Sequence, residues 1–182
     1  VLADSSLAPF ALNNMAILVG RAGQDSLALA YLTEAVTRFP AYYRGLYNLG
    51  VVWGKAGRNE KAREAFEKAL SLKPNHAPTW AALGNLDFDD KAFAEAATNF
   101  SEAIRFDPTM IGSRFKLGLA HRKLKDFPAA QVSFEEQLSL DPSSESGVYW
   151  LARTYRDRSL ETKGAASSFP GQAQALLVGY SP

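Results

Sequence analysis

The chain has 182 residues, with 20 lysines and arginines against 19 aspartates and glutamates, so its formal net charge is +1. This balance argues against a general nucleic-acid binder, which would show a clear basic excess. The sequence has no cysteine, which excludes disulfides, thiolate metal sites and cysteine nucleophiles. It also has no run of about 18 apolar residues, the length that a membrane-spanning helix needs.

The compartment stays open at this stage. The sequence begins at Val1 and not at Met. We therefore expect either a piece of a longer chain or a product whose leader has been removed, in the cytoplasm or after export.

A fixed 34-residue period organises most of the sequence, and residues 43–76 show it most clearly. Their pattern is Leu46, Leu49, Gly50, Trp53, Ala62, Phe66, Ala69 and Pro74. It returns as Trp80, Leu83, Gly84, Ala96, Phe100, Ala103 and Pro108, and again as Leu117, Gly118, Ala130, Phe134 and Pro142. Such a period is typical of repeat architectures, and it predicts four full repeats and a half.

One repeat reads as a helical hairpin. Apolar residues three and four positions apart place one stripe on a helix near 42–55 and another on a helix near 59–72. Gly57 can take the left-handed conformation that ends the first helix, and Pro74 ends the second. The same frame predicts helices near 9–22, 25–38, 76–89, 93–106, 110–123 and 127–140, after a lead-in at residues 1–8.

These offsets make the chain resemble the tetratricopeptide repeat (TPR) family, whose signature combines a large apolar residue, Leu-Gly, an aromatic, then Ala, Phe, Ala and Pro. The resemblance covers residues 9–158, with repeats near 9–42, 43–76, 77–110 and 111–144 and a half repeat from 145. It implies an all-α, right-handed superhelical solenoid of antiparallel helix pairs with a non-standard C-terminal cap. The first helix of each pair would line a concave groove.

The resemblance also indicates which residues face that groove. The candidate peptide-binding residues are Asn13, Asn14, Arg44, Tyr47, Asn48, Asn85, Phe115, Lys116, Leu119, Tyr149, Trp150 and Arg153. Asparagines prevail in the first three repeats, and an amide can pair with a partner's backbone. Aromatic and cationic residues prevail in the last two, a composition typical of interface anchors.

Each of these features also has a purely structural interpretation. Arg122, Lys123 and Arg156 fall in last helical turns, where the helix dipole favours a cation without any ligand. Tyr149 and Trp150 lie in the last hairpin and can pack under a C-terminal cap. Both interpretations stand at this point.

Two polar residues replace the expected aromatic at the end of a first helix, Asp87 in the third repeat and His121 in the fourth. One hypothesis is that they meet as a buried hydrogen-bonded pair. The other is that Phe88 takes over the packing while both polar groups reach solvent. With no nucleophile, metal-ligand set or glycine-rich phosphate loop beside them, we predict no catalytic site, no metal site and no cofactor.

After Asp157 the pattern decays. The segment KGAASSFPGQ reads as a loop, and Ala175 to Val178 form a short apolar patch. A repeat array needs its last apolar face covered, so residues 159–182 are interpreted either as a cap or as a tail that docks on a neighbouring subunit.

Two subtypes of the family can be compared by residue. Chaperone-adaptor members hold a C-terminal carboxylate with two lysines, two asparagines and an arginine, and only Asn48 matches that set here. The asparagines are more similar to a short version of the ladder in O-linked N-acetylglucosamine transferases, which grips extended peptide backbone.

We therefore expect a non-enzymatic adaptor or assembly factor that holds a protein segment in its groove. The groove cations would favour an acidic or C-terminal carboxylate group on that segment. The alternatives are a structural subunit of a larger complex, which uses its C-terminal tail and convex face, and the targeting domain of a longer enzyme.

Overall fold

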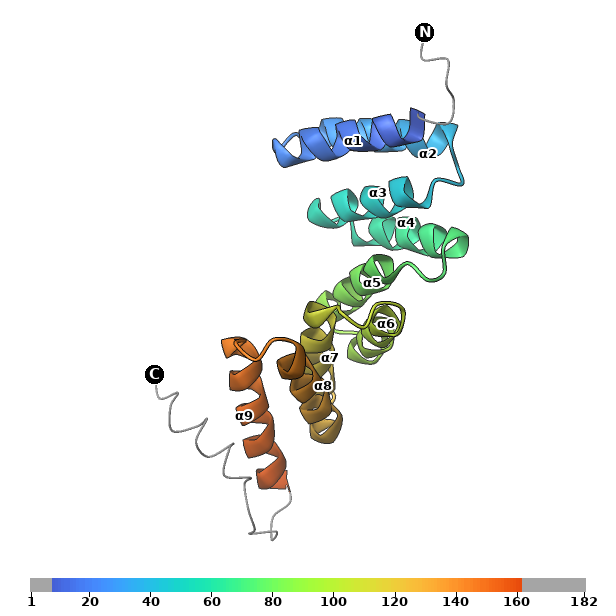
Figure 1. The fold of residues 1–182 in the computed structure, drawn as a ribbon. Coiled ribbons are helices and arrows are strands. Elements are labelled where there is room, and N and C mark those ends of the chain that lie inside the picture. The colour runs from blue at the N-terminus through green and yellow to red at the C-terminus, as the bar shows by residue number, and fades with distance from the viewer. Residues whose placement is uncertain (1–7, 162–182) are drawn as a thin grey trace. The chain divides into compact units, whose positions relative to one another are not determined.

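The computed structural model describes residues 8–161, which form nine α-helices and no strand (Figure 1). The first four are α1 (Ala8–Arg21), α2 (Asp25–Arg38), α3 (Tyr43–Lys55) and α4 (Asn59–Leu72). They are followed by α5 (Ala77–Asp89), α6 (Phe93–Phe106), α7 (Ile111–Lys123), α8 (Phe127–Leu140) and α9 (Glu145–Glu161). The predicted all-α class is confirmed.

The helix bounds lie within one residue of those that the period predicts. The last helix differs, because α9 continues to Glu161 and so includes residues 159–161, which the sequence assigned to a cap or tail. The remaining part of that predicted segment, residues 162–182, lies outside the described residues, as do residues 1–7 of the lead-in.

The chain divides into two compact units, and the division falls within α5, between Leu86 and Asp87. Unit 1 contains α1 to α4 and most of α5, and unit 2 contains the last residues of α5 and α6 to α9. Each unit is described by itself below.

The turns inside the pairs share one backbone conformation. Gly23 and Gly57 have φ of 77° and 69°, the left-handed region that glycine adopts at little cost. Lys91 and Lys125 stand at the same place in the next two pairs, with φ of 63° and 62°. Side-chain-bearing residues therefore make a turn that the sequence associates with glycine.

A close approach between the paired helices explains two other glycines. A Cβ added at Gly50 would lie 2.5 Å from Cε1 of Phe66, and one at Gly118 would lie 2.7 Å from Cε1 of Phe134. Both phenylalanine rings are buried, so they have little room to move. The absent side chain lets the ring of the second helix pack on the backbone of the first.

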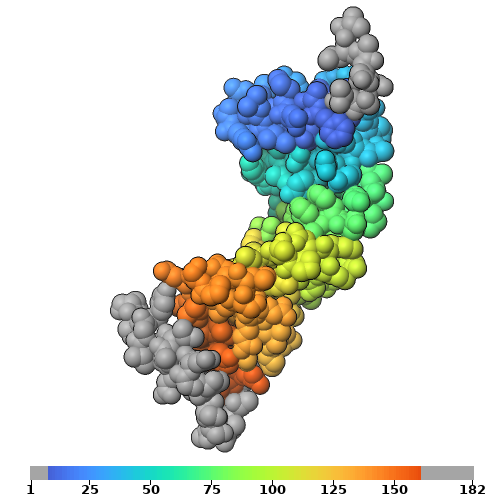
Figure 2. Space-filling model, in the orientation of Figure 1, coloured from blue at the N-terminus to red at the C-terminus, as the bar shows by residue number. Residues whose placement is uncertain are grey.

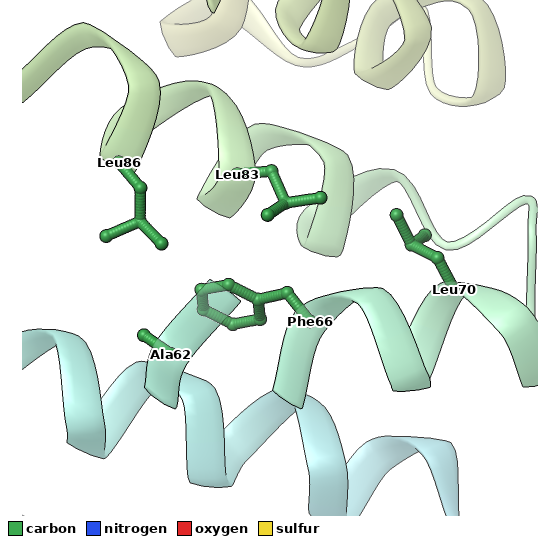
Figure 3. Packing of buried hydrophobic residues seen from close by; sticks show 5 residues of the cluster. All are labelled: Ala62, Phe66, Leu70, Leu83 and Leu86. Atoms are coloured by element: carbon green, nitrogen blue, oxygen red, sulfur yellow. The ribbon is translucent and has the colours of Figure 1, made fainter. Parts of the chain in front are cut away.

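Unit 1 has two hydrophobic clusters. The first joins α4 to α5 and consists of Ala62, Phe66, Leu70, Leu83 and Leu86, whose side chains point toward one another (Figure 3). The second joins Ala16 of α1 to Ala28 and Leu32 of α2, with Leu49 and Val52 of α3 packed against them. Each helix pair is thus stabilised by the next one along the chain, as expected for stacked repeats.

Unit 2 repeats this arrangement. Ala96, Ala97, Phe100 and Ala120 form one cluster, and Ala130, Phe134 and Leu151 form another. Between α8 and α9 the packing has a local variation, because the buried Gln137 occupies the place that Ala69 and Ala103 hold in earlier pairs. Gly147 faces it, and a Cβ there would collide with the Gln137 side chain.

Both hypotheses for Asp87 and His121 need correction. Asp87 is buried, with 3% of its surface exposed, and its carboxylate accepts a hydrogen bond of 2.5 Å from the side-chain amide of Asn99. His121 Nδ1 is buried without a hydrogen-bond partner among the described residues. Phe88 does take part in packing, with its ring centroid 5.3 Å from that of Phe93.

Candidate functional site

Within each unit the first helices of neighbouring pairs contact one another directly, α1 with α3 and α7 with α9. One side-chain hydrogen bond links α1 to α3 and another links α7 to α9, and in both cases the two bonded residues are 35 positions apart in the sequence. The side of each unit that α1 and α3, or α7 and α9, form together is called its first-helix face. The candidate residues of the sequence, apart from Asn85 in α5, belong to these four helices.

In unit 1 the joining contact is neutral. Asn48 of α3 donates a hydrogen bond of 2.6 Å from its side-chain amide to the side-chain oxygen of Asn13 in α1. Asn13 is buried, with 6% of its surface exposed, so its role is to orient the Asn48 side chain and not to contact a partner protein. Asn14 is exposed, Asn48 is half-buried, and the bond leaves the Asn48 side-chain oxygen able to accept another donor.

Aromatic rings flank these amides. The ring of His76, just before α5, lies edge-on to Tyr43 and Tyr47 of α3, at centroid distances of 5.1 and 5.2 Å. Burial raises the pKa of Tyr47, so its hydroxyl stays neutral. Burial, with smaller contributions from Arg44 and Lys73, lowers the pKa of His76. Arg44 itself is exposed and donates to the hydroxyl of Tyr43 at 3.2 Å.

In unit 2 some candidates belong to the core. Phe115 and Leu119 of α7 pack against the cluster of Ala130, Phe134 and Leu151, with the Phe115 ring 5.8 Å from that of Phe134. Trp150 of α9 also packs there. Lys116 and Tyr149 are exposed. The face of unit 2 therefore combines half-buried aromatic rings with an exposed cation and phenol.

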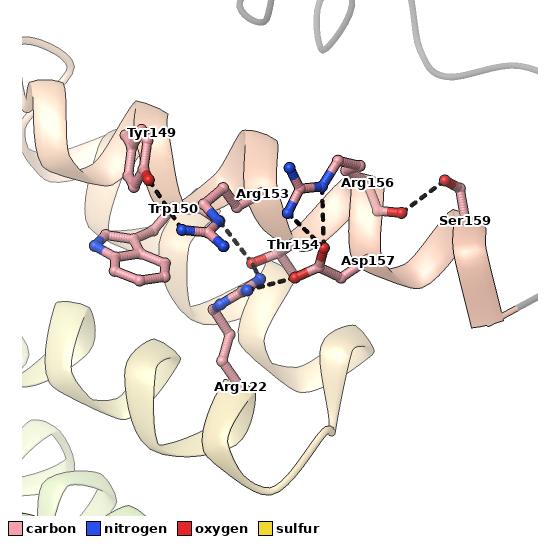
Figure 4. A network of polar contacts seen from close by, with 8 residues as sticks. All are labelled: Arg122, Tyr149, Trp150, Arg153, Thr154, Arg156, Asp157 and Ser159. Atoms are coloured by element: carbon pink, nitrogen blue, oxygen red, sulfur yellow. Dashed lines mark hydrogen bonds and ion pairs between the residues drawn. The ribbon is translucent and has the colours of Figure 1, made fainter. Parts of the chain in front are cut away.

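Arg122 joins α7 to α9 (Figure 4). Its guanidinium donates to the hydroxyl of Thr154 at 2.8 Å and to the carboxylate of Asp157 at 2.6 Å. The same carboxylate pairs with Arg156 at 3.0 Å. Burial alone would raise the pKa of Asp157, but hydrogen bonds from Arg122 and Arg156 outweigh it and lower the pKa. Arg122 and Arg156 are thus engaged within the chain.

Arg153 has a different environment. Its guanidinium lies 5.4 Å from the ring centroid of Trp150 and 5.7 Å from that of Tyr149, and it donates to the Tyr149 hydroxyl at 3.0 Å (Figure 4). Among residues 8–161 no carboxylate forms an ion pair with it. Its Nε atom is buried without a hydrogen-bond partner in the same range. Arg153 is therefore a positioned cation whose charge the described chain does not neutralise.

Sequence reasoning missed three of these features. It did not single out Tyr43, it did not pair Asn13 with Asn48, and it did not pair Arg122 with Asp157. The spacing of 35, one repeat and one residue, is a signal that could have found both pairs.

Two other classes of site find no support in the described part of the chain. Between residues 8 and 161 no three His, Cys, Asp or Glu side chains are grouped as a metal ion would require. No helix in that range is long and apolar enough to cross a membrane.

Comparison with known proteins identifies the repeats. Two family models described as tetratricopeptide repeat match residues 43–76 and 111–144. These are the second and fourth intervals of the predicted period.

Curated relatives match only part of the chain. A UDP-N-acetylglucosamine--peptide N-acetylglucosaminyltransferase of Giardia intestinalis is 31% identical over 99 residues, which are 54% of this chain and 7% of that protein. Anaphase-promoting complex subunit 3 of Schizosaccharomyces pombe is 29% identical over 41% of this chain and 11% of that protein. The matches span about a tenth of these relatives, so their activities do not carry over.

Solved structures share the fold over most of the chain. MamA from Desulfovibrio magneticus RS-1 has a TM-score of 0.77 at 21% identity, with 100% of both chains covered. PilF of Pseudomonas aeruginosa has a TM-score of 0.76 at 21% identity, covering 97% of this chain and 78% of that one. YrrB, a TPR protein described as having an unusual peptide-binding site, has a TM-score of 0.75 at 19% identity, covering 89% and 84%. Because the repeat matches and the fold agree, the chain belongs to the tetratricopeptide repeat family.

Proposed function

We propose that this TPR protein-interaction module acts as an adaptor or assembly factor, in which each unit holds a segment of a protein partner on its own first-helix face. The partner's backbone pairs with amides in unit 1. An acidic side chain or C-terminal carboxylate of a partner binds Arg153 in unit 2. The module has no catalytic role in this proposal.

The observation that carries the proposal is the contrast between two arginines beside Trp150. Arg122 lies 5.1 Å from the ring centroid of Trp150 and is neutralised by Asp157. Arg153 lies 5.4 Å from the same centroid and has no acidic partner among the described residues. A guanidinium held between aromatic rings loses little conformational entropy when it binds a carboxylate. It is also suited to bidentate pairing.

Unit 1 supplies the contacts for backbone. Asn48 is oriented by its bond to Asn13, which fixes the direction in which its free oxygen accepts. Asn14, the residue after Asn13, is exposed. Amide side chains both donate and accept, so they can replace the hydrogen bonds that an extended peptide makes with water.

A second candidate is a structural subunit of a larger assembly. The exposed apolar residues of α1, among them Phe10 at 44% and Leu18 at 64%, favour it, because exposed apolar patches mark interaction sites. The two candidates are compatible, since the residues concerned are different.

The test uses short peptides with free C termini, selected on the protein from a display library and measured by fluorescence polarisation. We expect Arg153→Glu to weaken binding at least about tenfold, equivalent to about 1.4 kcal/mol, and amidation of the peptide terminus or removal of its acidic side chains to do the same. Lys125→Glu makes the same charge change at an exposed turn of unit 2 and serves as the control.

Equal affinities for the wild type, Arg153→Glu and Lys125→Glu would contradict the assignment of Arg153. Selected peptides that lack any carboxylate preference would contradict the acidic-partner part of the proposal.

A further inference from the structure

Helix α1 exposes an apolar surface at positions that are packed in α3 and α5. Met15 is 42% exposed and Leu18 is 64% exposed, and Ala11 is exposed one turn before Met15. These three residues are four and three positions apart, so they lie on one side of the helix. In the view of Figure 2, the dark blue atoms of α1 lie at the end of unit 1 away from α5.

The repeat explains what this surface is. One period later, the same three positions are Gly45, Leu49 and Val52, and the last two pack against the core of the preceding pair. In α5 the corresponding residues Leu83 and Leu86 are buried against α4. In α3 and α5 this side of the helix packs against the preceding helix pair. The surface of Ala11, Met15 and Leu18 is thus a packing surface without a described partner, in a position where repeat proteins need a polar outer face.

We infer that two copies of this chain associate through this surface, with their α1 helices antiparallel about a two-fold axis that passes between Asn14 and Met15. This register places Leu18 of each copy opposite Ala11 of the other, a large residue against a small one. It brings the two Met15 side chains together at the centre, where a flexible thioether fills irregular space. An isologous contact of this kind closes at a dimer.

Charge favours a second copy over a partner of opposite charge. Arg21 is the one charged residue of Ala8–Arg21, so the surface offers nothing to attract an acidic or basic partner. In the antiparallel register the two Arg21 side chains lie at opposite ends of the contact, about 20 Å apart at 1.5 Å per residue, and do not repel.

This inference goes beyond the proposed adaptor function, because it needs no partner peptide. It predicts that the molar mass of the chain, 19.8 kDa as a monomer, approaches twice that value as concentration rises. Light scattering after size exclusion, with sedimentation equilibrium over a range of concentrations, measures it.

Met15→Glu combined with Leu18→Glu should abolish the dimer, because both side chains are exposed in the monomer and four like charges would lie within the contact. Val132→Glu is the matched control, since Val132 is an exposed apolar residue of α8, at 53%, outside this surface. Helix content by circular dichroism should be unchanged in all three proteins.

The register has its own test, which the absence of cysteine makes clean. A mixture of Ala11→Cys and Leu18→Cys proteins, distinguished by tags of different size, should give mixed cross-links with a short bis-maleimide faster than either protein alone. A dimer that cross-links Leu18→Cys to itself faster would overturn the antiparallel register.

A wild type that stays monomeric at all concentrations would overturn the inference. So would a monomer that co-sediments with neutral phosphatidylcholine vesicles, which would assign the surface to lipid. A chain that dimerises only after residues 162–182 are deleted would assign the surface to that segment instead.

Discussion

Within each unit, a side-chain hydrogen bond between residues 35 positions apart links two first helices, but the chemistry of that bond differs between the units. In unit 1 the contact is a neutral amide pair, Asn48 with Asn13, and in unit 2 it is the charged pair of Arg122 with Asp157. The scaffold therefore specifies where a polar contact crosses between neighbouring pairs and leaves its chemistry free. In unit 2 that contact engages Arg122, whereas Arg153 has no acidic partner among residues 8–161.

The turns differ in the same way. Unit 1 uses Gly23 and Gly57 in the left-handed conformation, and unit 2 uses Lys91 and Lys125. The comparison predicts that removing the neutral contact of unit 1 costs less stability than removing the charged contact of unit 2. It also predicts that replacing a strained turn residue of unit 2 by glycine increases stability.

The largest effect should come from the feature that both units share. Gly118→Ala should lower the free energy of unfolding by about 3 kcal/mol, because the new Cβ would lie within 2.9 Å of three atoms of the buried Phe134 ring. Gly112→Ala in the same helix meets nothing within 4 Å and should be neutral or stabilising by up to about 1 kcal/mol.

Gly50→Ala and Gly54→Ala form the corresponding pair in unit 1, where the nearest atoms are 2.5 and 3.9 Å away. Urea unfolding of all four variants measures the effect. If Gly118→Ala and Gly112→Ala were equally stable, the close approach of the two helices would be wrong.

The next effect separates the two contacts. Arg122→Met should cost about 2 kcal/mol, because it removes two charge-assisted hydrogen bonds and leaves the Thr154 hydroxyl and the Asp157 carboxylate without this partner. Asn48→Ala should cost about 1 kcal/mol, since the bond is between neutral groups. Thermal denaturation of both variants gives the ranking, and a larger loss for Asn48→Ala would reverse the comparison.

The turns give a smaller effect of opposite sign. Lys125→Gly should stabilise the protein by about 0.5 to 1 kcal/mol, because glycine adopts the φ of 62° without strain and the higher entropy of the unfolded chain offsets only part of that gain. The reciprocal change Gly57→Lys should destabilise unit 1 by a similar amount. Guanidinium unfolding should show the two shifts in opposite directions, and shifts of the same sign would exclude turn strain as their cause.

The smallest effect is a dependence of stability on pH. Burial lowers the pKa of His121 below its usual 6.5, although Asp126 opposes the shift. The unfolded chain then binds the proton more readily than the folded one, so the contribution is fully present above about pH 6.5 and is lost as pH falls below it.

His76 in unit 1 shifts in the same direction, so the wild-type slope contains both residues. His121→Phe should therefore reduce the loss of stability on acidification without abolishing it. Unfolding free energies measured at several pH values test this, and an unchanged slope in the variant would show that His121 is not the group involved.

The fold was predictable because its signals are local. Glycines or prolines mark most helix ends, and the apolar residues recur with the helical period, so the eight full-repeat helices could be placed to within one residue. The left-handed conformation of Lys91 and Lys125 was not predicted, because it is imposed by the repeat and not by the preference of lysine.

The candidate face was less predictable. Asn13 was expected to meet a partner and is buried, and the ion pair between Arg122 and Asp157 was not expected. These outcomes depend on which side chains reach across from one pair to the next. Residue type and periodicity do not determine that reach, because long side chains have several rotamers.

The most direct test of the central claim, that the first-helix face carries the partner, uses the indole N–H signals of the three tryptophans. Nuclear magnetic resonance of the nitrogen-15-labelled chain would follow them while a selected peptide is added to saturation. The account predicts a large shift for Trp150, which lies beside Arg153, and almost none for Trp53, which packs in the core of α3 to α5 beneath Lys61. Saturating peptide that leaves the Trp150 signal in place would contradict it.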